Sequence, residues 1–381
     1  MDLTLLGDKL KRYREQFQAT LADIQQATGI AEDRLCAFEA GQATPTGDEI
    51  LILADYYQCD YKFFVSNEKL APFEQTETLF RLHGSELSKE DRWTIQEFLF
   101  LCECEEFLEQ VVPRIPRKPF VFSASGNYFK GHGLDCAKQL RQHLGYGPTE
   151  VGANVFEDLR KIGTHVFRRQ LANSSISGLF ILHPVAGKCV LVNYEEDVYR
   201  QRFTAAHEGG HAILDSSDQV VVSFTKSPKG DLREIRANTF AANLLLPRSL
   251  LLAIPDHKRW DEKKASEYAA RFKVSTVALA VGLKENNLID SGTFSTVRSA
   301  MVPRDAKEDP ELPGSLSPKG KERKLTLLRR GLSDYYVGLC FDAYDQGYVT
   351  AGRLAEILLL GSPNELHDLA KLYGRSLQHG S

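Results

Sequence analysis

The sequence predicts a mainly α-helical protein with a small β-sheet in its middle third, an all-α N-terminal domain and a helical C-terminal region. Apolar residues recur at spacings of three and four near both ends of the chain, as amphipathic helices require. Two short runs rich in aliphatic residues, 178–183 and 188–193, flank the turn Pro184-Val-Ala-Gly187, which is typical of a β-hairpin. Proline-rich stretches at 113–133 and 303–318 separate the blocks.

Composition sets the broad class. The chain has 381 residues, 43% of them hydrophobic, enough for two or three cores. A net charge of −4 gives no global attraction to nucleic acid or anionic membranes. We find no signal peptide and no apolar run long enough to span a membrane, and the seven cysteines form no C-x-x-C pair. We therefore expect a cytoplasmic protein with reduced thiols and no membrane partner.

Residues 1–66 are predicted to form a helical domain with a tight turn at Gly29. The pattern Gln18-x-x-Leu21-Ala22, Ala27-x-Gly29-Ile30, Leu35-x-x-Phe38-Glu39-x-Gly41 and Pro45 resembles the XRE type of helix-turn-helix. By that resemblance the recognition helix begins at Glu32, Asp33 and Arg34. Gln18 and Gln42 would then lie near DNA phosphates.

The negative charge of this domain argues against DNA binding. Residues 1–65 hold six basic and eleven acidic side chains, a net of 6 − 11 = −5, whereas DNA affinity depends largely on neutralising phosphates. Ala31 also stands where Ser or Thr usually caps the recognition helix. Operator binding and a protein-binding or dimerising role of the same fold both remain open.

Residues 67–115 are predicted to be a helical connector. Ser88 and Asp91 form a capping box, and the helix should run to Val112, before Pro113. Its apolar positions are too many for a free spacer, so we expect it to pack on a neighbouring element or on a second copy of the chain in a homodimer.

Residues 116–300 are predicted to form the central domain. After a boundary loop, 113–133, we expect helices at 134–144 and 151–162, then the two strands. An extended peptide can add to the edge of such a sheet as an extra strand. His165 and His183 are interpreted as structural.

The helix expected at 200–215 carries the motif His207-Glu208-Gly-Gly-His211. One helical turn separates the two histidines, so both imidazoles can reach one zinc ion, and Glu208 lies beside it as a general base. Gly209 and Gly210 each cost about 1 kcal/mol relative to Ala inside a helix. Another backbone or a substrate should therefore pass close to them.

A catalytic zinc needs a third protein ligand. The downstream carboxylates are Asp215, Asp218, Asp231 and Glu234. Asp215 is better placed to accept an imidazole N–H than to bind the metal. Glu234, on the helix that Pro247 ends, is the predicted third ligand; the alternative is a solvated glutamate favoured by the helix dipole.

Several separated segments resemble the ImmA/IrrE family of zinc metallopeptidases. They are Val192-Asn193, Arg202-Phe203-Thr204, Ala206-His-Glu-Gly-Gly-His and Glu234-x-x-Ala-Asn-x-Phe-Ala-Ala-x-Leu-Leu-x-Pro247. The resemblance implies a zincin-like α+β fold with His207, His211 and Glu234 as zinc ligands and Glu208 as the base. Gly209 and Asp215 depart from the family pattern, where a larger residue and a His are common.

The remainder is predicted to be a linker, residues 301–322, followed by a helical region, residues 323–381. Proline and charge make the stretch 303–318 read as flexible. The basic run 319–330 is interpreted as a solvated helix start, with phosphate contact as the lesser alternative.

Together these features predict a zinc-dependent endopeptidase whose protein substrate, by family resemblance, is a transcriptional regulator such as a repressor, in a stress, mobile-element or defence setting. The alternative is a DNA-binding regulator or antitoxin whose peptidase fold cuts nothing. Glu208 argues against that alternative, because a zinc site that is only structural does not need a base.

Overall fold

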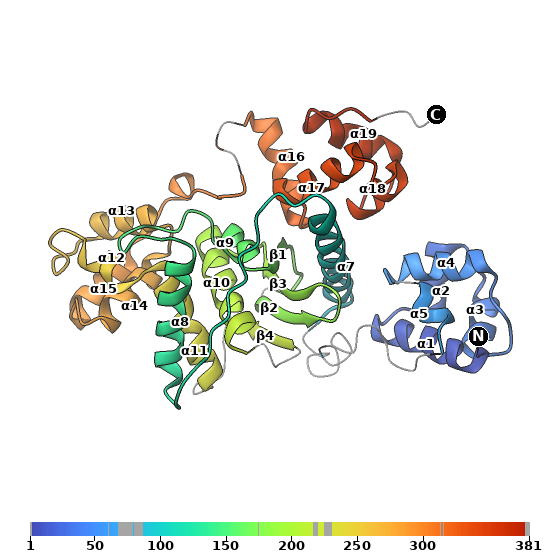
Figure 1. The fold of residues 1–381 in the computed structure, drawn as a ribbon, viewed down its shortest axis with the longest axis horizontal. Helices are drawn as coiled ribbons and strands as arrows, with labels where there is room; N and C mark the ends of the chain where they lie inside the picture. Colours follow the sequence, from blue (N-terminus) through green and yellow to red (C-terminus); the bar gives the residue numbers. More distant parts are fainter. Residues whose placement is uncertain are drawn as a thin grey trace. The chain divides into compact units, whose positions relative to one another are not determined.

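The computed structural model describes residues 2–59, 61–67, 79, 87–173, 175–215, 220–224, 231–312, 314 and 316–377. Its contacts divide the chain into two compact units (Figure 1). Unit 1 comprises Met1–Glu103 with the short segments Leu171–Asn173 and His183–Val185, and unit 2 comprises the rest. The predicted class, mainly α with a small sheet, is confirmed.

Unit 1 begins with five short helices. They are α1 Leu3–Gln16, α2 Leu21–Thr28, α3 Glu32–Glu39, α4 Gly47–Tyr56 and α5 Tyr61–Val65. Capping boxes at Thr20 and Thr46 start α2 and α4. Gly29 ends α2 in the left-handed conformation, φ 75°, as the predicted turn needs. Ala31 precedes α3 and makes no side-chain cap.

The connector helix, α7, spans Lys89–Val111. The Ser88 hydroxyl accepts the Asp91 N–H at 3.1 Å, and the Asp91 carboxylate lies 3.4 Å from the Ser88 nitrogen, so the predicted capping box is present. Within unit 1 the Trp93 ring stacks on Phe17, with centroids 4.3 Å apart. The neighbour that covers the first part of this helix is therefore the N-terminal helical domain.

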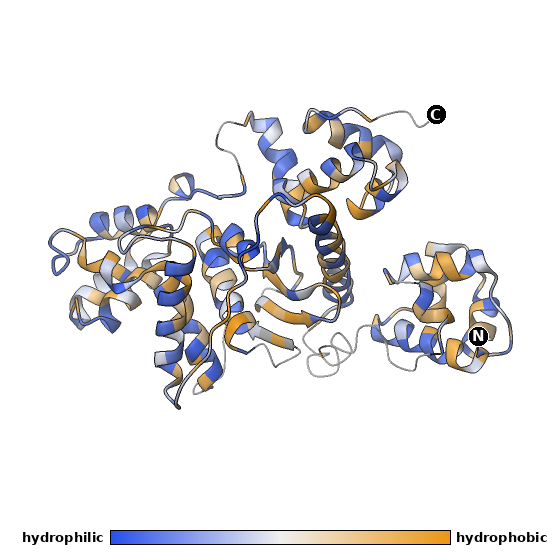
Figure 2. Ribbon diagram, in the orientation of Figure 1, coloured by the Kyte–Doolittle hydropathy of each residue, from blue (hydrophilic) through white to orange (hydrophobic). Residues whose placement is uncertain are grey.

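Unit 2 contains one four-stranded sheet in the order β1-β3-β2-β4. The strands are β1 Thr164–Arg169, β2 Ile176–His183, β3 Gly187–Asn193 and β4 Val220–Phe224. β1 runs parallel to β3, and β4 runs antiparallel to β2 with Ser223 opposite Gly178. The predicted hairpin strands correspond to β2 and β3, whereas β1 and β4 were not predicted. Figure 2 shows the hydrophobic colouring of β2 and β4.

The helices α9 Val155–Lys161 and α10 Val198–Leu214 pack against this sheet, and α11 Leu232–Leu245 and α8 Phe129–His143 form further layers beyond α10. α10 packs against β3 and α11, and α11 also packs along α8. The expected loop at 113–133 ends earlier than predicted, because α8 begins at Phe129. Gly133 lies inside it, where a Cβ would come within 2.4 Å of the Arg236 carbonyl oxygen.

The rest of unit 2 is helical. Its helices are α12 Arg248–Leu252, α13 Glu262–Phe272, α14 Thr276–Glu285, α15 Ser291–Ser299, α16 Pro318–Arg329, α17 Asp334–Asp345, α18 Ala351–Ile357 and α19 Pro363–Leu372. Among the described residues, no helix is both long and apolar enough to cross a membrane.

The segment predicted to be a flexible linker is instead tied to the sheet. The Arg168 guanidinium of β1 donates to Asp309 at 2.9 Å and to Glu311 at 2.8 Å, and Arg160 of α9 donates to Glu311 at 2.7 Å. Both arginine side chains are almost fully buried. The flexible-linker prediction is therefore wrong for residues 309–311, because their charged groups neutralise buried cations.

Candidate metal and catalytic site

The candidate site is built on α10. The Asp197 carboxylate caps its N-terminus by accepting the Tyr199 N–H, and Asp215 stands at its C-cap. The predicted helix bounds, 200–215, therefore lie close to the observed ones. Because His207 and His211 are one turn apart, their rings lie on the same face, with centroids separated by 4.8 Å.

The two glycines of the motif are explained by packing within the chain. A Cβ at Gly209 would lie 2.5 Å from Leu159 Cδ2, on α9. A Cβ at Gly210 would lie 2.9 Å from Phe240 Cδ1 and 3.4 Å from Ala237 Cα, both on α11. The predicted close approach of another backbone thus occurs at Gly210, and it brings α11 within reach of the histidines.

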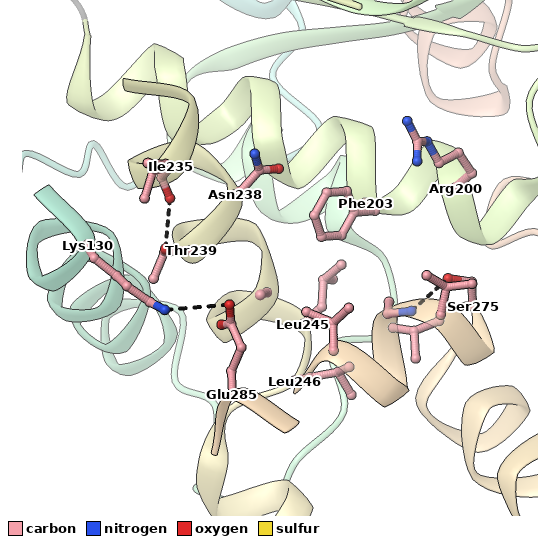
Figure 3. A pocket seen from close by; sticks show the side chains of 15 residues that line it. Lys130, Arg200, Phe203, Ile235, Asn238, Thr239, Leu245, Leu246, Ser275 and Glu285 are labelled. Atoms are coloured by element: carbon pink, nitrogen blue, oxygen red, sulfur yellow. Dashed lines mark hydrogen bonds and ion pairs between the residues drawn. The ribbon is translucent and has the colours of Figure 1, made fainter. Parts of the chain in front are cut away.

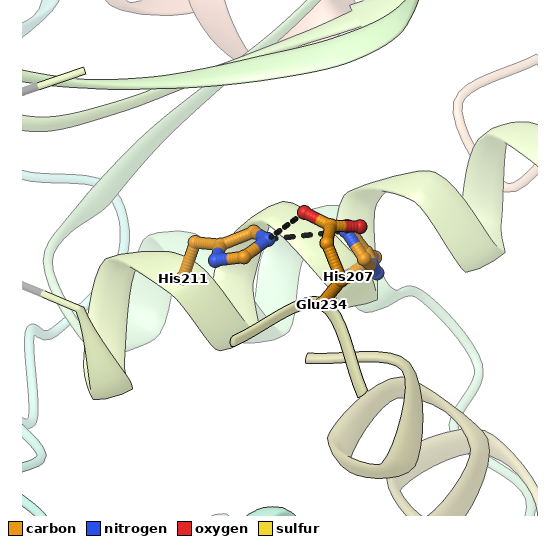
Figure 4. Close-up of side chains that lie close together, drawn as sticks. All are labelled: His207, His211 and Glu234. Carbon is orange, nitrogen blue, oxygen red and sulfur yellow. Dashed lines mark hydrogen bonds and ion pairs between the residues drawn. The ribbon is translucent and has the colours of Figure 1, made fainter. Parts of the chain in front are cut away.

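Glu234 lies in the first turn of α11 and points at the two histidine rings (Figure 4). The His207 and His211 Nε2 atoms are 3.1 Å apart. Glu234 Oε1 lies 3.2 Å from His211 Nε2, and Oε2 lies 3.5 Å from His207 Nε2. One ligand atom from each residue therefore falls within 4.8 Å of the others.

The donor set and its spacing fit a zinc ion. Ligand atoms about 2.0–2.1 Å from a tetrahedral zinc lie about 3.3 Å from one another, close to the three separations observed. Two imidazoles and one carboxylate are also a typical ligand set of catalytic zinc, which keeps a fourth position open. Glu234 Oε2 has no hydrogen-bond partner although it is buried, as expected for an atom reserved for a cation.

The other ring nitrogens are oriented by hydrogen bonds. His207 Nδ1 lies 3.2 Å from Asn238 Oδ1, and His211 Nδ1 lies 2.8 Å from Asp215 Oδ2. Since both acceptors are oxygens, each Nδ1 donates its proton, so each Nε2 can present its lone pair to a metal ion that displaces the proton held there. Arg236 holds Asp215 in turn, and it also donates to the Leu214 carbonyl oxygen at 3.1 Å.

Electrostatics make this cluster attractive to a positive charge. Burial alone would lower the pKa of His211, but hydrogen bonds to Asp215 and Glu234 outweigh it and raise the pKa to about 9. Burial opposes ionisation of Glu234 as well, yet the two histidines hold its pKa well below the usual range.

Glu208 lies beside the cluster and is fully buried. Neither of its carboxylate oxygens has a hydrogen-bond partner within the described residues. Burial raises its pKa, and the nearby His207 and His211 work against that rise. Gly178 leaves room for it, because a Cβ there would sit 3.2 Å from Glu208 Cγ. An unpartnered carboxylate of raised pKa is suited to moving a proton.

The remaining candidates from the sequence lie elsewhere. Asp231 caps α11 by accepting the Arg233 N–H at 2.9 Å, and Asp218 lies outside the described residues. His165 contacts Glu105 and Glu106 at 2.8 and 3.1 Å, and His183 lies 3.2 Å from Glu103. Neither histidine belongs to the cluster.

Asn238 is a site residue that the sequence analysis included only as part of the family pattern. Its signal was positional: it follows Glu234 by four residues on the same helix, so the two share a face. A polar residue there can reach the same histidine pair that Glu234 reaches.

The five residues proposed for DNA contact lie in unit 1. Gln18, Glu32, Asp33, Arg34 and Gln42 are all exposed. The Arg34 guanidinium donates to Glu49 Oε2 at 2.8 Å and lies over the Phe38 ring. That hydrogen bond lowers the pKa of Glu49 to about 2. Arg34, the basic residue of α3, is therefore already paired within the domain.

Comparison with known families finds two matches. Residues 159–284 match the Peptidase_M78 family, described as the IrrE N-terminal-like domain, and residues 5–61 match a helix-turn-helix domain. No curated protein matches the chain. The two matches agree with the architecture expected from the sequence and support a chain that joins a peptidase-type domain to a helix-turn-helix domain.

Proposed function

We propose that this chain is a zinc-dependent endopeptidase that cleaves a regulatory protein, such as a transcriptional repressor. The observation that carries the proposal is the convergence of two imidazole Nε2 atoms and one carboxylate, with a buried, unpartnered glutamate beside them. The match to a peptidase family over residues 159–284 supports the same reading.

Each residue has a distinct role in this proposal. His207, His211 and Glu234 hold the ion, while Asn238 and Asp215 keep the two rings in the required tautomer. Zinc bound there would act as a Lewis acid that activates water and polarises the peptide carbonyl. Glu208 takes the proton from the attacking water and delivers it to the leaving amine.

The sheet offers a place for an extended substrate. β1 and β4 are the outer strands, and the end of β1 is bridged to Arg330. Within the described residues no further strand pairs with β4, and Ser223 of β4 lies opposite Gly178, next to Glu208. A peptide added to the outer edge of β4 would therefore lie near the base.

A regulatory protein is the proposed substrate because of the attached domain. The resemblance to ImmA/IrrE peptidases implies this substrate class, and the helix-turn-helix match agrees with a role in regulation. This step rests on analogy between folds, so it needs its own experiment.

Metal analysis of the purified protein tests the ligand set. We expect about one zinc per chain in the wild type and a large loss in both His207→Ala and Glu234→Ala. Asp231→Asn is the matched control, since it removes a charge from the same helix end while an Asn side chain can still cap α11. Retention of zinc by Glu234→Ala, with loss in Asp215→Ala, would show that the ligand assignment is wrong.

Co-expression tests cleavage. A regulator encoded beside this protein should disappear when it is co-expressed with the wild type and persist with Glu208→Gln. Equal loss with both proteins would contradict the role of Glu208, and persistence with both would remove that regulator as the substrate.

A second candidate function is a DNA-binding regulator that cleaves nothing. The match of residues 5–61 to a helix-turn-helix domain favours it, and the neutralised Arg34 and the exposed Glu32 and Asp33 oppose it. A salt-dependent gel shift on DNA from its own promoter, with no loss of any co-expressed protein, would select this function instead.

A further inference from the structure

A cavity of about 350 Å³ opens beside the candidate metal site (Figure 3). It is walled by α10, α11 and α14, all in unit 2. Its volume falls within the range of pockets that hold a ligand group. The proposed hydrolysis assigns no role to the cavity itself.

The cavity lies close to His207, one of the candidate metal ligands. Asn238 lines it and lies 3.2 Å from His207 Nδ1. Phe203, which also lines it, stacks on the His207 ring with centroids 6.5 Å apart. Ile235 follows the ligand Glu234 directly in the chain. A group bound in the cavity would therefore lie next to a group bound at the cluster.

The lining is mostly aliphatic, and part of it lacks cover. Ile235, Val277 and Val281 remain 38%, 46% and 39% exposed although they face a concave surface. Leu245, Leu246 and Val274 form the buried part of the wall. Exposed aliphatic side chains in a concavity favour an apolar occupant, because that occupant removes their surface from water.

The polar groups around the cavity have partners within the chain. The Thr239 hydroxyl donates to the Ile235 carbonyl oxygen at 2.7 Å, and the Ser275 hydroxyl accepts the Ala278 N–H at 3.1 Å. Lys130 and Glu285 lie 3.5 Å apart and offset each other's charge. Arg200 is directed to Glu196 and Ser177. The lining therefore offers no strong binding site for a charged group.

We propose that this cavity receives a large aliphatic or aromatic side chain of the protein substrate, from a residue that flanks the cleaved bond. The inference rests on the proposed peptidase function and names the side-chain class that the enzyme selects. Ile235, Val277, Ala278 and Val281 determine that selection.

Two hydroxamate peptides test the pocket without requiring catalysis. They are identical except that the residue beside the metal-binding group carries an isobutyl side chain in one and hydrogen in the other. Their dissociation constants are measured by calorimetry on the full-length, zinc-loaded protein. We expect the isobutyl compound to bind the wild type at least about tenfold more tightly. A third compound with a carboxyethyl side chain should bind no better than the glycine-type compound.

Ala278→Phe fills the cavity from α14 and should abolish the preference for isobutyl. Its zinc content and its far-UV circular dichroism spectrum, compared with those of the wild type, show that the variant is folded and loaded. Ala253→Phe adds the same bulk at an exposed position outside the cavity, and it should retain the wild-type preference.

The outcomes separate this inference from the function on which it rests. Equal affinities for the isobutyl and glycine-type compounds, a preference that survives Ala278→Phe, or tightest binding of the carboxyethyl compound would each overturn the pocket assignment. A wild-type protein that holds no zinc would instead refute the proposed peptidase function.

Discussion

The α3 surface of unit 1 and the α10–α11 cluster of unit 2 differ in how their functional side chains are partnered. On α3, Arg34 is already bonded to Glu49, and its acidic neighbours Glu32 and Asp33 face solvent. In the cluster, two Nε2 atoms and a carboxylate point at one another. The basic group of α3 is already paired with a carboxylate of its own domain, whereas the groups of the cluster are arranged to bind a cation.

The difference shows what each motif specifies. In His207-Glu208-x-x-His211 the spacing itself positions the chemical groups, because successive turns of a helix share a face. A helix-turn-helix pattern specifies buried residues and turns, such as Leu35, Phe38 and Gly29. It leaves the exposed residues that would touch DNA free to vary, so the fold alone does not identify the partner.

The largest expected effect comes from removing the base. Glu208→Gln should slow cleavage of the regulator by about 10²- to 10⁴-fold, the usual contribution of a general base, with zinc content unchanged. The rate of loss of the regulator and the metal content of the same preparation measure both. Glu267→Gln, at an exposed position of α13, is the matched control and should match the wild type. If Glu208→Gln cleaved the regulator at a rate within a few-fold of the wild type, Glu208 would not be the general base.

The next largest effect should be a dependence of stability on pH, which comes from the buried ion pairs of His165. Burial opposes a charge on His165, but hydrogen bonds to Glu105 and Glu106 outweigh it and raise its pKa to about 10, from an ordinary value near 6.5. A raised pKa in the folded state stabilises the protein fully below about pH 6.5, and this stabilisation is lost as the pH rises toward 10. We therefore expect the free energy of unfolding of unit 2 to fall by a few kcal/mol across that range.

Tryptophan fluorescence can follow unit 2 by itself. The chain has two tryptophans, Trp93 in unit 1 and Trp260 in unit 2, so Trp93→Phe leaves a reporter of unit 2 alone. His165→Leu in the same background should lose most of the fall in stability between pH 6.5 and 10. An unchanged pH profile would mean that the histidine is not the titrating group.

Asn238 should have a smaller effect, on metal affinity. Removing a residue that orients a ligand typically weakens metal binding by about 10- to 100-fold, so we expect this for Asn238→Ala in a competition with a zinc chelator. Asn243→Ala is the control, because the Asn243 amide donates to the Thr239 carbonyl oxygen on the same helix and away from the cluster. If Asn238→Ala and Asn243→Ala bound zinc with equal affinity, Asn238 would not be orienting a metal ligand.

The smallest effect should come from the α3 surface. The Glu32→Gln/Asp33→Asn variant removes two negative charges there, so affinity for duplex DNA at low salt should rise only a few-fold, and the rise should vanish at high salt. Fluorescence anisotropy measures it, with Glu262→Gln/Glu267→Gln on α13 as the charge-matched control. If neither the variant nor the wild type binds DNA at low salt, a protein partner for this domain is favoured.

Much of the fold follows from local sequence. The capping box at Ser88, the turn at Gly29 and the hairpin between β2 and β3 all follow from short-range rules, and the helices α7, α9 and α10 lie close to the predicted ranges. The three residues of the metal cluster were also predicted from helical spacing and family resemblance. Their role as ligands is still a prediction that awaits the metal analysis.

The misses share a physical cause, which is that the partners lie far away in the chain. β1 ends in Arg168-Arg169, and two arginines do not suggest a buried strand. The acids that neutralise Arg168 are Asp309 and Glu311, which are too distant in the sequence to be recognised as its partners. For the same reason those acids read as part of a solvated linker. The start of α8 was missed because Gly131 and Gly133 suggest a loop, whereas Gly133 is needed for contact with α11.

The Asp309–Glu311 anchor also affects where this protein can be divided. A fragment that stops at residue 300, where sequence composition places the end of the catalytic domain, would retain Arg160 and Arg168 but lose the acids that offset their buried charges. If such a fragment were inactive, the cause could be damage to its fold, and the result would not show that the C-terminal helices are needed for activity. A cut placed after residue 311 keeps these contacts and gives up only the later ones, such as the bridge from Arg169 to Arg330, so that fragment is the better test of whether the C-terminal helices control the proposed activity.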